Sequence, residues 1–144
     1  MAFNGTFEHT LDAKNRLTVP SRFRAELSGG VFLVQGPDPC ISLYPAKTYE
    51  ALTQAALEGL NPMSGQARRL RRMSHAYAMH TELDSAGRVM LSPRHLEHAG
   101  IERDVVVIGA GDCLELWDPS TWADYDRELT SQAPDLAESL GHPA

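Results

Sequence analysis

One short pattern occurs twice in this chain of 144 residues, and it constrains the fold more than any other feature of the sequence. In each copy an aspartate is followed four residues later by an arginine, and a short apolar run comes next. The copies are Asp12–Arg16 and Asp84–Arg88, with Asn15 and Gly87 just before the arginines. Asn and Gly tolerate the left-handed backbone of a tight turn, and an aspartate side chain can close such a turn. We therefore predict two turns of one design, oriented by Asp12, Asn15, Asp84 and Gly87.

The similarity extends from the turns to most of the chain. Arg16 and Arg22 recur 72 positions later as Arg88 and Arg94, and further matches follow at a separation of 73. These later matches pair Val34 with Val107, Gly36 with Gly109, Cys40 with Cys113, Leu43 with Leu116, Tyr44 with Trp117, and Tyr49 with Trp122. Self-similarity at a nearly fixed spacing indicates a duplicated structural unit.

Each copy predicts a turn, a short strand, a short helix, two strands and an aromatic-led helix, which is an α+β pattern. Halves of about seventy residues would each bury only roughly 60% of their unfolded surface, so we expect them to share one core or to oligomerise. We divide the chain into a first repeat (1–60), a linking amphipathic helix (61–79), a second repeat (80–130) and an acidic, flexible tail (131–144).

The expected elements follow from periodicity and from turn residues. Strands are predicted at 3–10, 17–19, 31–34, 40–44, 80–83, 88–91, 105–108 and 114–117. Helices are predicted at 21–27, from 45 to the break at 59–62, at 63–79, from 93 to 100, and at 120–129, with Ser92 and Asp118 as N-caps.

The composition, with 42% hydrophobic and 22% charged residues, is that of a soluble globular protein. The net charge is −6, but it is unevenly distributed. Residues 1–103 hold 12 Lys and Arg against 10 Asp and Glu, whereas residues 104–144 hold one basic residue and nine acids. Residues 9–24 hold four basic residues and one acid. A local basic face is compatible with an anionic partner.

No apolar run reaches the ~20 residues of a membrane span, and the N-terminus lacks the regions of a secretory signal. Cys40 and Cys113 occupy equivalent repeat positions within apolar runs, which predicts buried, reduced thiols. We therefore expect a cytoplasmic protein.

The turn pattern also resembles a known family. The residues that carry the resemblance are Phe7, Leu11-Asp12, Lys14-Asn15-Arg16-Leu17, Pro20 and Phe23-Arg24, echoed by Asp84 and Gly87-Arg88. This string closely resembles the MraZ family of bacterial transcriptional regulators, which carry two SpoVT/AbrB-like domains in one chain. The resemblance covers nearly the whole sequence, from Phe3 to about Leu129.

The resemblance implies a swapped-hairpin β-barrel built from the two repeats, with short flanking helices, and a ring-shaped homo-oligomer. It implies a DNA-binding repressor associated with the nucleoid. Its partner would be double-stranded promoter DNA, bound at direct repeats upstream of the division and cell-wall gene cluster, the protein's own promoter included.

Arg16 and Arg88 are the first candidates for DNA contact. The guanidinium fork suits phosphate oxygens and the O6/N7 edge of guanine, and a two-stranded β element can enter the major groove. The alternative is that each arginine only pairs with its own aspartate and pins the turn. The spacing favours neither, and the two roles are compatible; the resemblance favours DNA contact.

Four further cations, Lys14, Arg22, Arg24 and Arg94, are candidate phosphate contacts, which supply affinity and register rather than sequence choice. Ala86 stands in the second copy where the first has Lys14. We therefore expect the first copy to contribute more to DNA binding.

Other motifs have weaker functional interpretations. The basic run at 68–72 is interpreted as the charged outer side of an amphipathic helix, or as an intersubunit surface, in preference to a nucleic-acid patch. His95 and His98 are interpreted as helix-surface histidines rather than metal ligands, because no third ligand accompanies them. No catalytic constellation is present, so we expect neither an enzyme nor a cofactor.

The sequence leaves other functions open. An AbrB-like antitoxin would use the acidic C-terminal segment to bind a toxin. An oligomeric scaffold would not bind nucleic acid at all. An enzyme using His95, His98 or Cys113 would need a cleft that the repeat does not predict.

Overall fold

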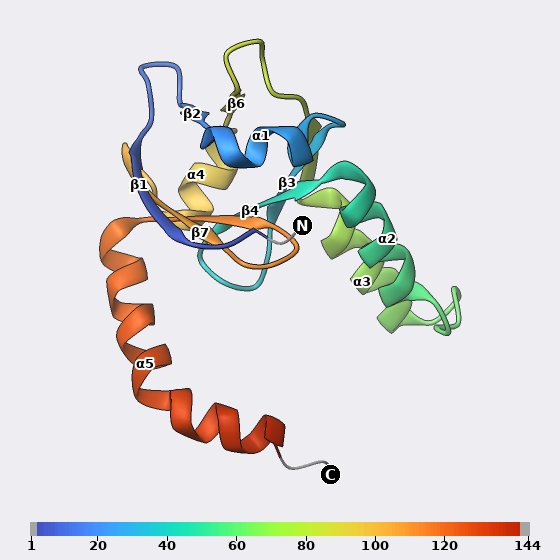
Figure 1. Ribbon diagram of the computed structural model, residues 1–144. Coiled ribbons are helices and arrows are strands. Elements are labelled where there is room, and N and C mark those ends of the chain that lie inside the picture. The colour runs from blue at the N-terminus through green and yellow to red at the C-terminus, as the bar shows by residue number, and fades with distance from the viewer. Residues whose placement is uncertain (1–2, 142–144) are drawn as a thin grey trace.

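The computed structural model describes residues 3–141, which form eight strands and five helices (Figure 1). In chain order these are β1 (Thr6–Thr10), β2 (Arg16–Thr18), α1 (Ser21–Leu27), β3 (Val31–Gln35), β4 (Ile41–Pro45), α2 (Ala46–Leu57), α3 (Gly65–Ala76), β5 (Ala78–Thr81), β6 (Arg88–Met90), α4 (Pro93–Ala99), β7 (Asp104–Gly109), β8 (Leu114–Trp117) and α5 (Pro119–Gly141). The predicted α+β class is confirmed.

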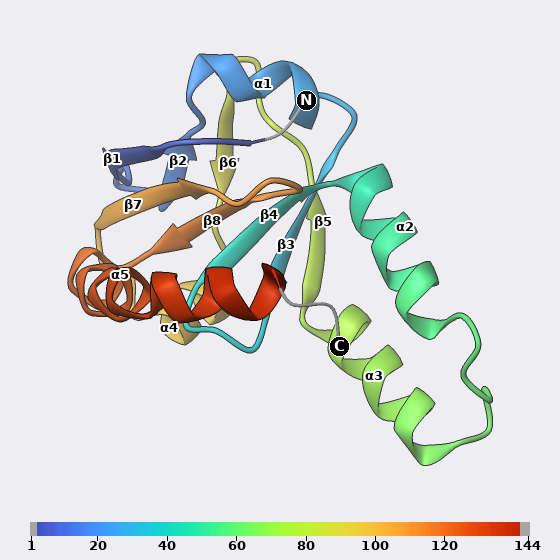
Figure 2. The same cartoon turned by 60° about the horizontal axis from the view of Figure 1, so that its bottom comes forward.

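The two repeats exchange strands throughout the sheet. Six antiparallel strands lie in the order β1-β7-β8-β4-β3-β5, and β2 pairs with β6 in a separate antiparallel ribbon (Figure 2). β1 of the first repeat pairs with β7 of the second, while β5 pairs back with β3. Hydrogen bonding stops at β1 and β5, so the barrel is not closed. The turns that follow these strands lead the chain out of the sheet and into the ribbon.

The strand registers reveal a local two-fold relation between the repeats. In the sheet Ile41 lies opposite Leu116 and Leu43 lies opposite Leu114, and a shift of 73 residues exchanges the two pairs. The ribbon obeys the same rule, since Leu17 lies opposite Val89, at a shift of 72. The duplicated sequence therefore folds as one symmetric unit rather than as two domains side by side.

One part of the predicted alignment is wrong by one residue. Thr6 pairs with Ile108, and the equivalent pair in the other repeat joins Ala78 to Val34, so β3 and β7 are related by a shift of 74 rather than 73. The structural equivalents of Val34 and Gly36 therefore lie one residue after the predicted Val107 and Gly109. The cause is that the loop between β7 and β8 is one residue shorter than the loop between β3 and β4.

A single apolar core joins both repeats. It lies between one face of the sheet, the ribbon, and helices α1 and α4. Its fully buried members include Leu17, Leu27, Leu33, Ile41, Leu43, Val89, Val107, Leu114 and Leu116. A smaller cluster covers the opposite face of the sheet, where Trp117 packs with Trp122 and Tyr125 of α5. Cys40 and Cys113 are buried free thiols, as predicted.

Burial in these positions also suppresses the acidity of both thiols. It is the main cause that raises the pKa of Cys40 to about 12 and that of Cys113 to about 11. At neutral pH both cysteines are therefore protonated, and they lack the thiolate form that reacts with oxidants and alkylating agents.

Two helices differ from the prediction at their ends. α3 ends at Ala76, and β5 begins within the segment that we had assigned to the linking helix. α5 continues to Gly141, so residues 131–141 of the predicted flexible tail are helical, with Pro134 inside the helix. Residues 142–144 lie outside the described part of the chain. The polar composition of this segment obscured its Leu, Ala and Glu residues, which favour helix.

We expect Leu116→Ala and Leu43→Ala to lower the free energy of unfolding by similar amounts, about 2–5 kcal/mol, because both side chains are completely buried at equivalent positions. Urea titrations followed by circular dichroism and by tryptophan fluorescence should give one coincident transition, since the repeats share a core. Leu52→Ala, at a 40% exposed position, is the control and should cost far less. Separate transitions for the two repeats would contradict the shared core.

Candidate nucleic-acid interface

The first turn is closed by one carboxylate. Asp12 Oδ1 accepts hydrogen bonds from the backbone N–H groups of Lys14 and Arg16, both at 2.9 Å. Its Oδ2 accepts from Arg16 Nε at 2.7 Å. Asn15 completes the turn with a φ of 57°, in the left-handed region. The carboxylate therefore holds the backbone of the turn and the direction of the arginine side chain at once.

The second turn repeats this geometry. Asp84 Oδ1 accepts from the backbone N–H groups of Ala86 and Arg88 at 2.9 Å, and Oδ2 accepts from Arg88 Nε at 2.8 Å. Gly87 takes the left-handed position with a φ of 76°. Each arginine therefore does pin its own turn through its aspartate. Only Nε is used in this pairing, and the terminal Nη nitrogens donate no hydrogen bond to other residues within 3–141.

The hydrogen bonds favour the ionised form of both carboxyl groups. The backbone N–H of Arg16, together with its guanidinium and the N–H of Lys14, holds the pKa of Asp12 below its ordinary value. The backbone N–H of Arg88 acts on the pKa of Asp84 in the same way, with the Arg88 guanidinium and the N–H of Ala86.

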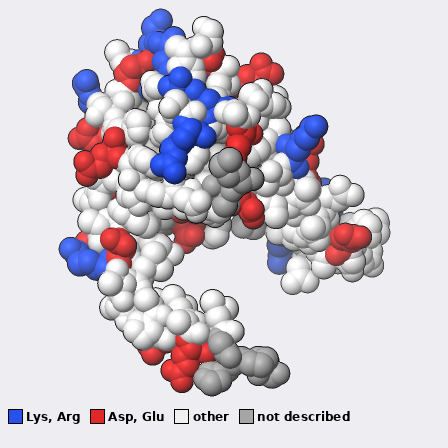
Figure 3. All heavy atoms as spheres, in the orientation of Figure 1, with Lys and Arg blue, Asp and Glu red and all other residues white. Residues whose placement is uncertain are grey.

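The two turns are joined to each other. Val19 N donates to Gly87 O, and Leu91 N donates to Asn15 O, both at 3.0 Å. These bonds are equivalent under the 72-residue shift, so each repeat fixes the turn of the other. Figure 1 shows the two turns projecting side by side from one end of the molecule, and Figure 3 shows Lys and Arg atoms at that end.

The ribbon under the turns gives the arginines a common face. Leu17 and Val89 are fully buried in the core, and alternation along each strand turns their neighbours outward. The outward face carries Arg16, Thr18, Arg88 and Met90. Arg16 and Arg88 are diagonal neighbours on this face, where such Cα atoms lie about 7–8 Å apart. Arg16 and Arg88 therefore share one outward face of the ribbon.

Thr18 and Met90 also lie on this face, which the sequence pattern did not predict. Thr18 is exposed and lies opposite Arg88, while Met90 is 53% exposed and lies opposite Arg16. Their alternation with Leu17 and Val89 was a signal in the sequence, but only the ribbon pairing shows that they flank the arginines.

Two of the other predicted cations lie over aromatic rings. The Arg22 guanidinium is 5.4 Å from the ring centre of Phe7 and 5.2 Å from that of Phe23. Arg94, its repeat equivalent, is 4.5 Å from the ring centre of Tyr77. Both arginines remain exposed on the short helices α1 and α4. Cation–π contacts of this kind orient the side chains while leaving their donors to solvent or phosphate.

Arg24 is directed toward the second turn. Its Nε donates to Val19 O at 2.9 Å, and its side chain lies so close to Gly87 that a Cβ atom there would collide with it. Lys14 is exposed in the first turn. The second turn, which has Ala86 in place of lysine, therefore has an arginine from the first repeat beside it.

His95 is not on the surface, and that prediction was wrong. It is 4% exposed and links α4 to the end of α3. Its Nε2 lies 3.1 Å from the carbonyl oxygen of Tyr77, which only accepts, so Nε2 carries the proton and Nδ1 accepts from Ser92. Ser92 also caps α4, as predicted. His98 Nε2 donates to Asp38 O at 2.9 Å.

The basic run at 68–72 lies on α3, where all four arginines are exposed. Within residues 3–141, no group of His, Cys, Asp and Glu side chains is arranged to hold a metal ion. The same part of the chain contains no helix with the length and apolarity to cross a membrane.

Comparison with known proteins places this two-repeat chain among the transcription regulators. The chain belongs to the MraZ family: the family described as "MraZ protein, putative antitoxin-like" matches residues 2–73 and again residues 74–139. The resemblance found in the sequence is thereby confirmed.

Relatives named "Transcriptional regulator MraZ" support the same assignment. The protein of Thermomicrobium roseum is 36% identical over 138 residues, 96% of each chain. That of Lactiplantibacillus plantarum is 38% identical over 138 residues, 96% of this chain and 97% of its own. That of Corynebacterium urealyticum is 42% identical over 125 residues, 85% of each chain. Transcription regulators are not a class of enzyme.

We expect Gly87→Ala to lower the free energy of unfolding by about 1–3 kcal/mol through backbone strain, and by more through the collision with Arg24. Gly100→Ala is the matched control, because Gly100 also has a positive φ of 65° but has open space around it. Urea denaturation measures both. Equal losses for the two variants would contradict the close packing of Arg24 on the turn.

The lowered pKa values of Asp12 and Asp84 predict a loss of stability in acid. A carboxyl group whose pKa is lower in the folded state stabilises the fold above its unfolded pKa of about 3.9, and this contribution disappears as the pH falls through the folded value. The unfolding free energy of the wild type should therefore decrease as the pH drops below about 4. The double variant Asp12→Asn/Asp84→Asn should show a smaller fall; an unchanged pH profile would refute the role of these carboxylates.

Proposed function

We propose that this chain is a sequence-specific, DNA-binding transcriptional repressor. Its sites would be direct repeats upstream of the division and cell-wall gene cluster, including its own promoter. One observation carries the proposal: two arginines, each fixed by an aspartate, share the outward face of a two-stranded ribbon. A ribbon of this width fits the major groove of B-DNA.

The arginines of the ribbon and the cations around it would have different roles in binding DNA. Arg16 and Arg88 keep their terminal Nη donors for acceptors such as guanine O6 and N7, because only Nε is held by the aspartate. Thr18 and Met90 would lie beside them at the base edges. Three other cations are exposed around the ribbon: Arg22, Arg94 and Lys14. They would bind phosphate oxygens and so set the register of the protein on the duplex.

The charge around the ribbon also suits an anionic partner. Arg16 and Arg88 each form an ion pair with their own aspartate, so the net positive charge at this end comes from the neighbouring Lys and Arg side chains. The phosphate backbone of DNA would neutralise it. We expect the first turn to contribute more, because it has Lys14, whereas the Nε of Arg24 beside the second turn already donates to Val19 O.

One ribbon makes few contacts, so affinity would come from repetition. A ring-shaped homo-oligomer would present many ribbons to successive repeats in the operator, and each binding event would raise the effective concentration of the next. The same proposal places the protein in the cytoplasm, associated with the nucleoid, and needs no cofactor.

We expect Arg16→Ala to reduce binding to its own upstream DNA by roughly 5–150-fold, the equivalent of about 1–3 kcal/mol of lost base recognition. Arg88→Ala should cost less. Fluorescence anisotropy at several salt concentrations measures both, with scrambled DNA for comparison. The control is Arg127→Ala, an exposed arginine on α5 that pairs with Asp124. Undiminished specific affinity in Arg16→Ala would refute its role, and no binding by the folded wild type at low salt would refute the repressor.

A second candidate function is that of an antitoxin, which the words "antitoxin-like" in the family's description favour. Its partner would be a toxin bound by the acidic α5. An antitoxin of this kind would suppress the toxicity of a co-expressed toxin, and the Arg16→Ala variant would retain that suppression while losing DNA binding. A non-DNA-binding scaffold would show neither activity.

A further inference from the structure

The outward face of the ribbon has a local two-fold axis. The axis passes through the middle of the ribbon at right angles to it, as in an antiparallel pair of strands. A half-turn about this axis exchanges Arg16 with Arg88. It also exchanges Thr18 with Met90, and both exchanges have the shift of 72 residues that relates the repeats. Each arginine Nε donates to its own aspartate, at 2.7 and 2.8 Å, so the arginines alone give the face no direction.

A symmetric face limits what a protein can recognise on DNA. Two-fold symmetry of a protein is matched by palindromic symmetry of its DNA site. A face with exact two-fold symmetry binds a site and its reverse complement equally, so it cannot distinguish the two directions along the duplex. The direct repeats of the proposed function each have a direction. Recognition of that direction therefore requires an asymmetry on the face.

Thr18 and Met90 break the symmetry of this face. Met90 is 53% exposed and carries an apolar, polarisable thioether, whereas Thr18 is exposed and carries a hydroxyl group. Met90 lies directly opposite Arg16, and Thr18 lies directly opposite Arg88. The two arginines therefore have chemically different neighbours across the ribbon.

The turns also differ, but in a way that carries no sequence information. Lys14 stands in the first turn where the second turn has Ala86. A lysine ammonium group suits phosphate oxygens, and phosphates are the same for every base sequence. Lys14 therefore adds affinity without distinguishing one base from another.

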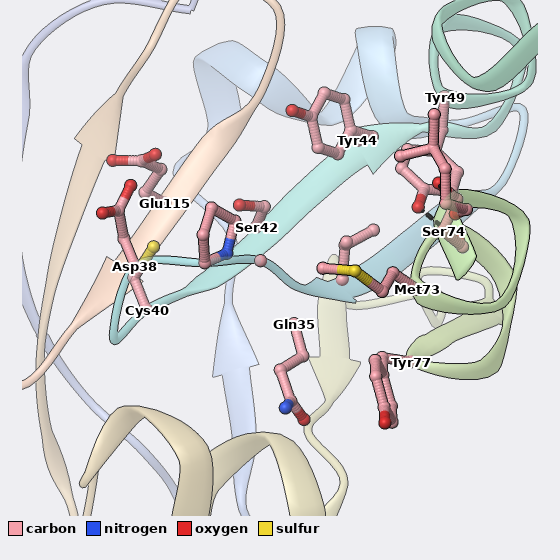
Figure 4. A pocket seen from close by; sticks show the side chains of 14 residues that line it. Gln35, Asp38, Cys40, Ser42, Tyr44, Tyr49, Met73, Ser74, Tyr77 and Glu115 are labelled. Carbon is pink, nitrogen blue, oxygen red and sulfur yellow. Dashed lines mark hydrogen bonds between the residues drawn. The ribbon is translucent and has the colours of Figure 1, made fainter. Parts of the chain in front are cut away.

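The surroundings of Met90 leave its side chain accessible to a ligand. Met73, which is 56% exposed, lines a groove of about 410 Å³ together with the aromatic residues Tyr49 and Tyr77 (Figure 4). Met90 instead lies on a three-residue strand whose outward face is otherwise made of arginine and threonine. The core on the other side of this strand is filled by Val89. Met90 thus presents an apolar group on a polar, cationic surface.

The two side chains suit different features of the bases. In the major groove thymine presents a C5-methyl group, which apolar side chains contact. Met90 can bury part of its exposed side chain against such a methyl group. The Thr18 hydroxyl both donates and accepts hydrogen bonds, so it accommodates several bases. The Met90 end of the face is therefore the more selective for thymine.

The ribbon spacing fixes which base Met90 can reach. Cβ atoms of directly opposed residues lie about 4.5–5.5 Å apart, and successive bases of one strand rise by about 3.4 Å. Met90 therefore reaches a base one or two steps from the base that Arg16 contacts.

We propose that Met90 and Thr18 determine the direction in which the ribbon binds its DNA site. Met90 contacts the methyl group of a thymine one or two steps from the base bound by Arg16, and the hydroxyl group of Thr18 takes the equivalent place beside Arg88. In the reverse orientation that thymine would meet Thr18 instead. This inference rests on the proposed function and names the base feature that the ribbon selects.

The first test removes the methyl group from the DNA. Deoxyuridine replaces one thymine at a time, at the same position of every repeat in the upstream DNA, and lacks only the C5-methyl group. At one position the replacement should weaken wild-type binding at least about fourfold, the effect of burying one methyl group. Fluorescence anisotropy measures the affinity, and the other thymines serve as controls.

Two protein variants assign this effect to its side chain. Met90→Ala should bind the thymine and deoxyuridine forms of that position equally. Met63→Ala, at an 80% exposed methionine in the loop between α2 and α3, is the matched control and should keep the wild-type difference. Circular dichroism checks that both variants are folded. A wild type that binds specifically but is insensitive at every position, or a Met90→Ala chain that keeps the difference, would overturn the inference.

The second test follows the direction of binding itself. An iron chelate that generates hydroxyl radicals is attached to Ala13→Cys, in the exposed part of the first turn, and DNA cleavage marks the side of each repeat where this turn lies. The native cysteines are buried and protonated at neutral pH, so they should add little background. With the native ribbon we expect cleavage on one side of each repeat.

Exchanging the two side chains should change that side. The double variant Thr18→Met/Met90→Thr keeps the composition and charge of the face, and cleavage should shift toward the other side of each repeat. Lys14→Ala/Ala86→Lys is the control, which exchanges the turn residues and should keep the original side. Cleavage on both sides with the native ribbon, or an unchanged side after the Thr18 and Met90 exchange, would contradict the inference.

The two proposals fail differently. A folded wild type that binds no upstream DNA at low salt would refute the repressor, and the direction of binding with it. Specific binding that neither deoxyuridine nor the exchange of Thr18 and Met90 alters would refute only the role of these two residues and keep the repressor.

Discussion

The structure depends on a carboxylate that closes a turn and holds an arginine at the same time. In each repeat one aspartate accepts two backbone hydrogen bonds and one from a guanidinium Nε. The two turns are then tied together by reciprocal bonds from Val19 and Leu91. Each aspartate positions its own arginine, and the bonds between the repeats fix the two turns relative to each other. The turns closed by aspartate and the strands exchanged between repeats therefore belong to the same structural unit.

The shared core follows from the same constraint. A turn that leads the chain out of the sheet leaves β1 and β5 to pair with strands of the opposite repeat, and the ribbon of β2 and β6 closes over the apolar face. Burial of Leu17 and Val89 under the ribbon turns the arginines outward. Hydrophobic burial and presentation of charge are therefore achieved by the same three-residue strands.

Some features were accessible from the sequence because their causes are local. The duplicated turns, the caps at Ser92 and Asp118, and the helix at Ser21–Leu27 depend on residues close in the chain. Other features depend on packing between distant segments. His95 is buried because α4 lies against the end of α3, and Arg24 reaches the second turn because the repeats interlock.

The sequence by itself determined that the chain is a duplication, which residues form its turns, and the family to which it belongs. These follow from spacing and from the conformations that Asp, Asn and Gly permit. Only the tertiary structure decided that Thr18 and Met90 share a face with the arginines and that β3 and β7 differ in register by one residue. The physical reason is that strand pairing and burial join residues about 70 positions apart, and no local preference specifies which of them meet.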